Sequence, residues 1–385
     1  MFKKRDFLVL LLVLVIIFFL VMFQSQSISQ EQVLEEEHTD HGFGPKMNFS
    51  NYSENSLIII SIIGLIITMI CAVLLERNIS RIASKTGKGI GTALMGIASS
   101  IPLLVIVVTL ALENRADLVL TNVVSANIAN LTLVLGILSF FKPLRRGKSF
   151  QKGFLALFIM LLSILIISFF INSNFEIVQD SSRNIASSEG IILIALLAFF
   201  ILFLNFFKSS EGSHLKSKNF GKEIFFAIFY GVAVAWFAST TVKAFILIAE
   251  IHSVPTIIIG SVIGVIGASL PELAIGLVCL IKKEHEAIFS NLITSNIVNF
   301  NLGLGLAAII MGGVMIDSIS YYFKVPFMIF VMFVSTFFFY PRRVGKITKQ
   351  KLLEKGKLDI GITRFEGIIL LGLFAFWIIM LLRFI

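Results

Sequence analysis

The chain has 385 residues, of which 57% are hydrophobic and only 14% are charged, as is typical of an integral membrane protein. Its formal net charge of +9 does not indicate a nucleic-acid partner, because 26 of the 32 Lys and Arg residues fall on one side of the alternating apolar segments. Cys71 and Cys279 both lie inside apolar segments, which excludes a disulfide framework and a cysteine-based metal site.

Apolar segments of about twenty residues, each long enough to cross roughly 30 Å of hydrocarbon, follow one another along the chain. They predict eleven membrane spans, at 6–23, 56–75, 89–112, 117–141, 153–171, 190–207, 223–250, 255–281, 286–309, 320–340 and 365–384. The positive-inside rule places the N-terminus in the cytoplasm and the C-terminus outside. Lys243 and Lys324 lie near the outer ends of spans, where a long side chain can extend to the headgroups. We therefore expect a multi-pass protein of the cell inner or plasma membrane.

Residues 1–55 form a segment of their own before the other spans. The span 6–23 follows three basic residues and fits either a cleaved signal sequence or a retained anchor. The absence of a clean A-x-A cleavage site after it favours the anchor. The outer segment that follows contains EEEHTDH at 35–41, which could collect divalent cations but is more typical of a solvated acidic tail.

Segments 96–136 and 265–305 are copies of each other, offset by 169 residues without a gap. By this offset SSIPLL (99–104) aligns with ASLPEL (268–273), and TNVVSANIAN (121–130) aligns with SNLITSNIVN (290–299). The copies coincide at Ser, Pro and Asn, which lipid-facing helices have little reason to share. Chance similarity between apolar helices is therefore a poor explanation.

Apart from span 6–23, ten spans remain, and they divide into 56–207 and 223–385, joined by a polar, basic linker at 208–222. Five crossings in each half mean that the second copy enters the membrane from the opposite side. The predicted fold is all-α: a ten-helix inverted-topology repeat of five plus five spans, preceded by an extra N-terminal hydrophobic helix. In such transporters the binding site lies near the midplane, where the halves meet.

Polar residues of the repeats converge on that midplane. At about 1.5 Å per residue from the helix entry, Ser100, Asn130, Asn299 and Glu272 lie in or close to the central third of their spans. The amides of Asn127 and Asn296 share helix faces with Asn130 and Asn299, and interhelical hydrogen bonding accounts for some of this group.

Pro102 and Pro271 are predicted to break their helices, because proline lacks an N–H and clashes with the carbonyl four residues before it. The carbonyls near Ala98 and Gly267 would then be available to water or an ion. The alternative is a packing kink, and the mirrored occurrence of the two prolines argues against it.

Glu272 is the only carboxylate deep inside any predicted span. An unpaired buried carboxylate is costly, so Glu272 is a candidate functional residue. A structural ion pair with Lys243 is the alternative. A proton or a hard cation such as Na⁺ or Ca²⁺ is the expected partner, since carboxylate, hydroxyl and amide oxygens suit these ions.

These motifs resemble those of the Ca²⁺:cation antiporter family, in the part of its members called the sodium/calcium exchanger membrane region. GASLPE (267–272) with SNLITSNIVN resembles the second α-repeat of that family, and SSIPL (99–103) with TNVVSANIAN resembles the first. The resemblance implies ten core helices, with cation sites between the third and eighth and between the second and seventh. It also implies alternating access by sliding of the first and sixth, here 56–75 and 223–250.

By this resemblance, the acid of the second repeat is Glu272. The cation-binding set that the resemblance and the residues together predict is Glu272, Ser269, Ser295, Asn299, Ser99, Ser100 and Asn130, with Glu272, Ser269 and Asn299 as metal ligands. No cofactor is expected other than the transported cations Ca²⁺, Na⁺ or H⁺.

Three positions depart from the family pattern: Leu103 replaces the acid of the first repeat, Ala126 replaces its serine, and Ala268 replaces a hydroxyl. With one carboxylate, a bound Ca²⁺ would leave one charge uncompensated in a low dielectric. We expect a secondary active antiporter that extrudes Ca²⁺ against Na⁺ or H⁺ by alternating access. A monovalent cation/proton exchanger and a non-transporting binding or regulatory homologue are the alternatives. An enzyme is not expected, because no His, Cys or Asp/Glu pair lies at membrane depth.

Overall fold

The fold is described from a computed structural model, which describes residues 53–83, 88–145, 159–164, 184–204, 220–316, 319–339 and 360–383. The predicted first span at 6–23, the acidic run at 35–41 and most of the linker at 208–222 lie outside these residues. The predicted span at 153–171 is represented by a helical stretch at 159–164.

Almost all of the described chain is helical. The helices are α2 (Glu54–Ala83), α3 (Lys88–Leu112), α4 (Ala116–Ala129), η3 (Asn130–Val134), α5 (Leu135–Phe141), α7 (Ser187–Leu204), α8 (Phe220–Ile251), α9 (Thr256–Ile263), η4 (Gly264–Ser269), α10 (Leu270–Lys282), α11 (His285–Ile297), η5 (Val298–Gly303), α12 (Leu304–Met311), η6 (Ser320–Lys324), α13 (Val325–Phe339) and α15 (Arg364–Arg383). The η elements are π-helical and continue directly into their α neighbours, so that α4–η3–α5, α9–η4–α10 and α11–η5–α12 are each one rod. Within the described residues, seven helices are long and apolar enough to cross a membrane.

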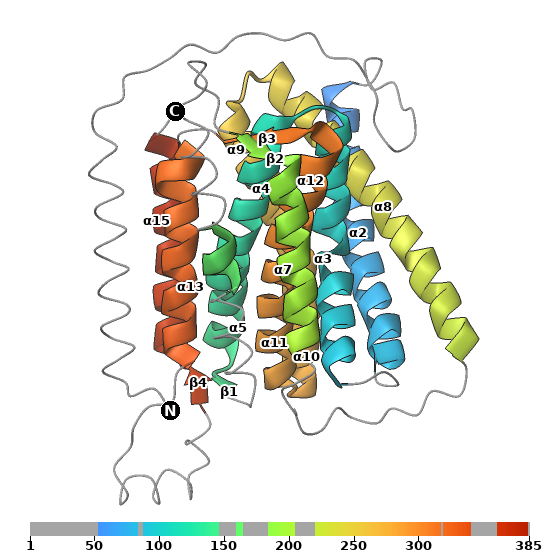
Figure 1. The fold of residues 1–385 in the computed structure, drawn as a ribbon, viewed down its shortest axis with the longest axis vertical. Coiled ribbons are helices and arrows are strands. Elements are labelled where there is room, and N and C mark those ends of the chain that lie inside the picture. The colour runs from blue at the N-terminus through green and yellow to red at the C-terminus, as the bar shows by residue number, and fades with distance from the viewer. Residues whose placement is uncertain are drawn as a thin grey trace, which may run out of the picture.

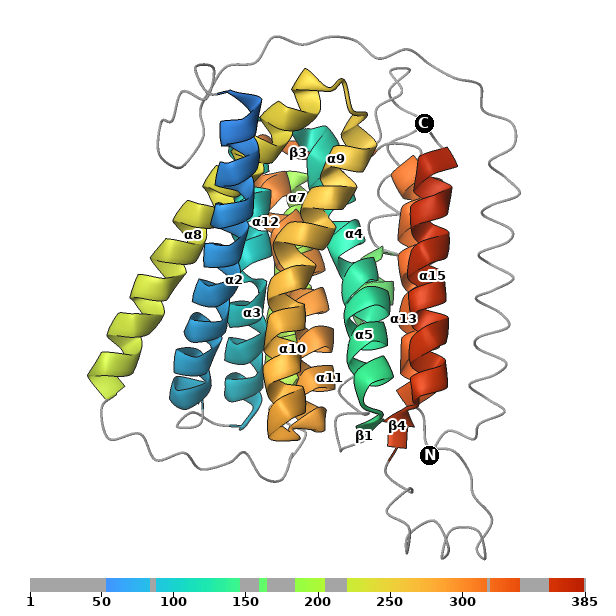
Figure 2. The same ribbon diagram turned by 180° about the vertical axis from the view of Figure 1, so that it is seen from behind.

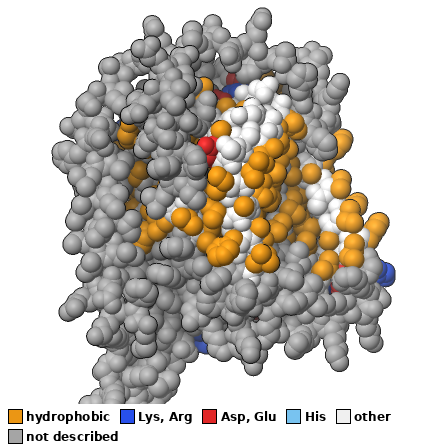
Figure 3. All heavy atoms as spheres, viewed as in Figure 1, with side chains coloured by type: hydrophobic (Ala, Val, Ile, Leu, Met, Phe, Trp, Pro, Cys, Tyr) orange, Lys and Arg blue, Asp and Glu red, His pale blue; other side chains and the backbone are white. Residues whose placement is uncertain are grey.

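The outward faces of these helices carry large hydrophobic side chains. On α8, Phe225, Ile228 and Val232 are each more than 60% exposed, and α2 presents a similar row of isoleucines. Hydrophobic side chains also dominate the described part of the face in Figure 3. An aqueous surface would not keep such rows, whereas a bilayer requires them. The chain is therefore a multi-pass integral membrane protein.

The helices form a bundle with a separate pair on each flank. α2 and α8 run together on one flank and α13 and α15 on the other, with the remaining helices between them (Figures 1 and 2). Gly64 lets α2 approach α8 closely, because a Cβ at this position would collide with the hydroxyl of Thr241. The central helices enclose the main hydrophobic core.

Two short antiparallel ladders join loops at opposite ends of the bundle (Figure 1). β1 (Leu144–Arg145), directly after α5, pairs with β4 (Ile360–Ile362), directly before α15. β2 (Asn184–Ala186), directly before α7, pairs with β3 (Gly313–Met315), directly after α12. Each ladder thus links a segment of the chain's first half to a segment of its second half.

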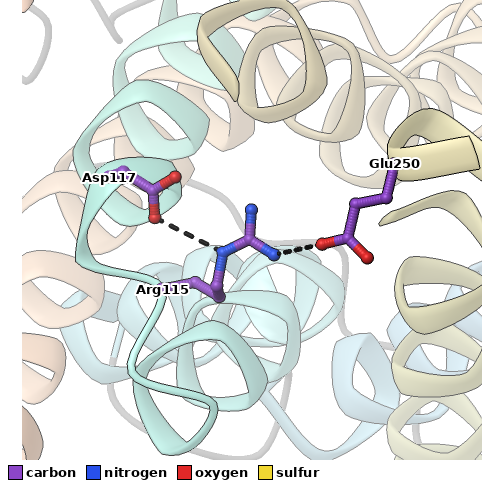
Figure 4. A network of polar contacts seen from close by, with 3 residues as sticks. All are labelled: Arg115, Asp117 and Glu250. Carbon is purple, nitrogen blue, oxygen red and sulfur yellow. Dashed lines mark hydrogen bonds and ion pairs between the residues drawn. The ribbon is translucent and has the colours of Figure 1, made fainter. Parts of the chain in front are cut away.

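Ion pairs fix the turn between α3 and α4 to helix α8 at the β2–β3 end. The Arg115 guanidinium lies 2.8 Å from the Glu250 carboxylate and 3.5 Å from that of Asp117 (Figure 4). A second pair joins Lys243 and Glu113 at 3.1 Å, with both side chains less than a fifth exposed. Lys243 therefore pairs with Glu113 in this structure.

Replacing Glu113 with glutamine should destabilise this end of the bundle, because the Lys243 ammonium would lose its partner in a mostly buried position. We expect a loss on the order of 1–3 kcal/mol, between the values for exposed and fully buried pairs. The thermal unfolding midpoint of the purified protein in detergent measures the effect. Asp117→Asn, at a side chain that is 41% exposed, is the matched control and should change the midpoint little. Equal midpoints for Glu113→Gln and the wild type would show that the pair does not hold the turn.

Lys324 does not extend to the headgroups, so that prediction was wrong. Its side chain is fully buried, and its Nζ donates a hydrogen bond to Thr121 Oγ1 at 2.8 Å. The reason is local: the hydroxyls of Thr121 on α4 and Ser320 on η6 are 3.4 Å apart and make the contact between these two helices polar. A charge-assisted hydrogen bond offsets part of the cost of burying the ammonium.

Candidate cation-binding site

Four rods of the bundle bring the predicted site residues together. α3 carries Ser99 and Ser100, the α9–η4–α10 rod carries Ser269 and Glu272, η3 begins at Asn130, and the α11–η5 rod carries Ser295 and Asn299. All seven side chains are at most 3% exposed. Hydrogen bonds link these four rods, as the following contacts show.

A reciprocal network joins the asparagines of the two repeats. Asn130 Nδ2 donates to Asn296 Oδ1 at 2.9 Å, and Asn299 Nδ2 donates to Asn127 Oδ1 at 3.4 Å. The amides of Asn127 and Asn296 also donate to each other's backbone carbonyls, at 3.3 and 3.5 Å. Under the 169-residue offset each bond is the counterpart of another. The network holds the Asn130 and Asn299 amide nitrogens and leaves their oxygens unused.

Two serines repeat the same reciprocity. Ser100 Oγ donates to the backbone carbonyl of Ser295 at 3.3 Å, and Ser269 Oγ donates to that of Ala126 at 3.2 Å. Ala126 and Ser295 are themselves counterparts under the offset. Since each hydroxyl donates its proton to a carbonyl, its oxygen lone pairs remain available as acceptors.

The Glu272 carboxyl is held on one side and unpaired on the other. Its Oε2 accepts a hydrogen bond from Asn291 Nδ2 at 3.2 Å, and Asn291 Oδ1 in turn accepts one from Ser99 Oγ at 3.3 Å. Because Lys243 pairs with Glu113, the alternative of a structural Lys243–Glu272 pair is not seen.

Three buried oxygens of the predicted ligand residues have no hydrogen-bond partner among the described residues: Glu272 Oε1, Asn130 Oδ1 and Asn299 Oδ1. Leaving a buried acceptor unsatisfied costs about 1–3 kcal/mol, so these three oxygens require an explanation. A hard cation is one such explanation, because carboxylate and amide oxygens are the ligands that Na⁺ and Ca²⁺ prefer. The candidate ligand atoms are thus one carboxylate oxygen and neutral amide oxygens. No cluster of three or more His, Cys, Asp or Glu occurs in the described chain.

Two of these three oxygens, those of Asn130 and Asn299, belong to residues in π-helical turns. η3 begins at Asn130 and η5 contains Asn299, so a π-helical turn occupies the same place in both repeats. Such turns are rare and occur frequently at functional sites. Pro271 follows the π-helical η4, whereas α3 continues as α-helix through Pro102. The two prolines therefore have different local structures.

Two residues near the site were missed from the sequence. Asn291 was recognised as a repeat position but was not included in the predicted ligand set. Glu76 lies just beyond the predicted end of its span, yet α2 continues to Ala83, so Glu76 also lies within the helix and close enough to Glu272 to interact electrostatically. Glu272 is therefore not the only acid within the helical bundle, although it is the deeper one.

The described residues thus form an apolar membrane bundle with buried, unpaired side-chain oxygens at two π-helical turns. The model of the family described as "Sodium/calcium exchanger protein" matches residues 56–206 and 222–383. The chain belongs to this family, whose members are secondary transporters and not enzymes. The predicted family membership is confirmed.

Individual relatives and solved structures agree with this assignment. The sodium/calcium exchanger MaX1 of Methanosarcina acetivorans is 23% identical over 319 residues, which cover 73% of this chain and 90% of MaX1. The putative antiporter CaxA of Alkalimonas amylolytica is 25% identical over 238 residues, covering 58% of this chain and 70% of CaxA. A structure of the sodium-calcium exchanger NCX_Mj matches with a TM-score of 0.61 at 17% identity, over 85% of this chain and 98% of NCX_Mj. The fold is thus that of an exchanger-type membrane protein.

Proposed function

We propose that the chain is a secondary active antiporter that extrudes Ca²⁺ in exchange for Na⁺ or H⁺ by alternating access. The observation that carries this proposal is the group of unpaired buried oxygens on Glu272, Asn130 and Asn299. They lie in a member of the exchanger family, and relatives bear the names sodium/calcium exchanger and antiporter. The full ligand set is Glu272, Ser269, Ser295, Asn299, Ser99, Ser100 and Asn130.

The proposed architecture is a ten-helix inverted repeat with halves at 56–207 and 223–385. The reciprocal hydrogen bonds of the asparagines and serines support it, since each has a counterpart at the 169-residue offset. The two ladders support it as well. β1 and β3 follow equivalent rods, α4–η3–α5 and α11–η5–α12, and they lie at opposite ends of the bundle (Figure 1).

The proposed orientation makes a testable prediction for three loops. Cysteines introduced at Ser210 and Lys349 should react only with a membrane-impermeant thiol reagent applied from the cytoplasm. A cysteine at Asp180 should react only from outside, because the positive-inside rule puts its loop there. Labelling in intact cells and in inverted vesicles distinguishes the two sides. If Ser210 and Asp180 were labelled from the same side, the two halves could not be antiparallel as proposed.

A monovalent cation/proton exchanger is the second candidate, and Leu103 favours it. Leu103 occupies the position symmetric to Glu272 and is 1% exposed, within the hydrophobic core. The empty site then carries at most one negative charge from these two positions. A single carboxylate balances a monovalent ion fully, whereas Ca²⁺ leaves a positive charge in a low dielectric.

Ion flux into proteoliposomes that contain the purified protein separates these candidates. Uptake of ⁴⁵Ca²⁺ should accelerate when the vesicles are loaded with Na⁺, or when their interior is made more acidic than the outside. The gradient that accelerates uptake, of Na⁺ or of H⁺, identifies the coupling ion. Exchange of ²²Na⁺ for protons without any response to Ca²⁺ would favour the monovalent exchanger. If no gradient moved any of the three ions, the chain would be a non-transporting homologue and the proposal would fail.

A further inference from the structure

Asn291 and Asn122 are counterparts in the two repeats, but their surroundings differ. The Asn291 amide donates to Glu272 Oε2 at 3.2 Å, and its oxygen accepts from Ser99 at 3.3 Å. Asn122 is fully buried, and neither its amide nitrogen nor its amide oxygen has a hydrogen-bond partner in the described structure. The asparagine side chain is therefore hydrogen-bonded in the second repeat and unpaired in the first.

The cause is the identity of the two partner residues. Where the second-repeat asparagine meets Glu272 and Ser99, the counterpart positions of the first repeat are Leu103 and Ala268. Both substitutions remove polar groups, so the acceptor and the donor that Asn122 would need are both absent. The rest of the polar network keeps its reciprocity, as the serine and asparagine bonds show. The loss of hydrogen bonds at Asn122 therefore follows from Leu103 and Ala268.

The charge near Asn122 also differs from that near Asn291. The residue next to it, Thr121, accepts a hydrogen bond from the buried Lys324 ammonium at 2.8 Å. Position 103, the counterpart of Glu272, carries no carboxylate. A cation on the Asn291 side faces Glu272 instead.

We infer that Asn291 is a positioning residue that holds the Glu272 carboxyl for the cation, and that the cation binds on this side of the site alone. The hydrogen bond to Oε2 fixes the carboxyl and leaves Oε1 as the oxygen that the cation meets. Asn122, the same residue type at the symmetric position, contributes nothing to cation binding. This inference rests on the proposed function and adds the side of the site on which the ion lies.

The symmetric pair supplies its own matched control. Asn291→Ala should raise the KM for Ca²⁺ in proteoliposome uptake about tenfold or more, as removal of a hydrogen-bonding support behind a ligand typically does. Asn122→Ala should change the KM by less than about twofold, because it removes no contact. Asn291→Gln keeps the amide and should recover part of the affinity. The midpoint of thermal unfolding in detergent, with and without Ca²⁺ alone, reports binding independently of transport.

A merely structural role for Asn291 would lower the amount of folded protein or the maximal rate without changing the KM, and that result would overturn the inference. Equal KM changes for Asn122→Ala and Asn291→Ala would also overturn it, since the site would then use both sides. If Asn291→Ala does not fold, the comparison of Asn291→Gln with Asn122→Gln decides in the same way. A wild-type protein that neither binds nor transports Ca²⁺ or Na⁺ would contradict the proposed function itself. That result differs from a failure of the inference about Asn291, because it is seen in the wild type before any variant is compared.

Discussion

Glu272→Gln is expected to abolish ion-driven transport while the protein still folds. The change keeps the size of the side chain and its ability to hydrogen-bond with Asn291, but it removes the only charge among the proposed ligands. Losing several kcal/mol of attraction for a cation corresponds to a reduction of transport by at least about a hundredfold. Flux in proteoliposomes, together with gel filtration of the same preparation, measures both parts of this expectation.

Asp117→Asn is the control for this experiment, because it makes the same chemical change at a partly exposed carboxylate away from the site. It should transport like the wild type. Wild-type flux in a monodisperse Glu272→Gln protein would remove Glu272 from the site and leave the three unpaired oxygens without their proposed explanation.

Leu103→Glu is expected to improve Ca²⁺ handling, since it places a second carboxylate at the position symmetric to Glu272. With two negative charges the site would balance a divalent cation, so the apparent affinity for Ca²⁺ should rise about tenfold or more. If the native ion is monovalent, selectivity should shift away from it. A buried carboxyl without a cation takes up a proton, so the gain should be greatest at alkaline pH. Uptake of ⁴⁵Ca²⁺ measured from pH 6 to pH 9 tests this dependence.

Asn122 gives the Leu103→Glu experiment its control. Its unpaired amide is expected to hold the new carboxyl as Asn291 holds Glu272, so the double change Leu103→Glu with Asn122→Ala should lose most of the gain. Unchanged Ca²⁺ uptake at every pH, in a Leu103→Glu protein that folds, would mean that position 103 does not face the ion.

The sequence predicted a set of residues that the bundle does bring together, because its signal is chemical and repeated. Ser, Pro and Asn coincided at a fixed offset, and most of those positions are buried. Some of them, such as Asn130 and Asn299, hydrogen-bond across the two halves. The helices α3, α8 and α15 also lie close to the predicted spans, since long apolar runs leave little choice of structure.

Other features depend on neighbours that a linear sequence does not reveal. The β1–β4 and β2–β3 ladders contain only two or three residues per strand, which is too short for any alternation of polar and apolar positions. The direction of the Lys324 side chain depends on the Thr121 hydroxyl of another helix. Glu76 was excluded because hydropathy ends a span at the first charged residues, whereas the backbone hydrogen bonds of α2 continue past them.

The difference between Asn122 and Asn291 shows a third limit. Residue type and repeat position are the same for both, so the sequence pattern treats them alike. Their difference in hydrogen bonding arises because Leu103 corresponds to Glu272, and Ala268 corresponds to Ser99. The sequence displays these departures, but the structure is needed to show which side chain they leave without a partner.

The position of a bound ion tests the central claim most directly. Crystals of the wild-type protein grown with Sr²⁺, which mimics Ca²⁺, or with Tl⁺, which mimics a monovalent cation, would reveal the ion by its anomalous scattering. We predict a peak slightly farther from Glu272 Oε1 than the about 2.3–2.6 Å of a Ca²⁺–oxygen bond for Sr²⁺, and farther still for Tl⁺, with the Asn299 and Asn130 oxygens in contact with the ion. An ion bound elsewhere in the bundle, with these three oxygens still unpaired, would contradict the account.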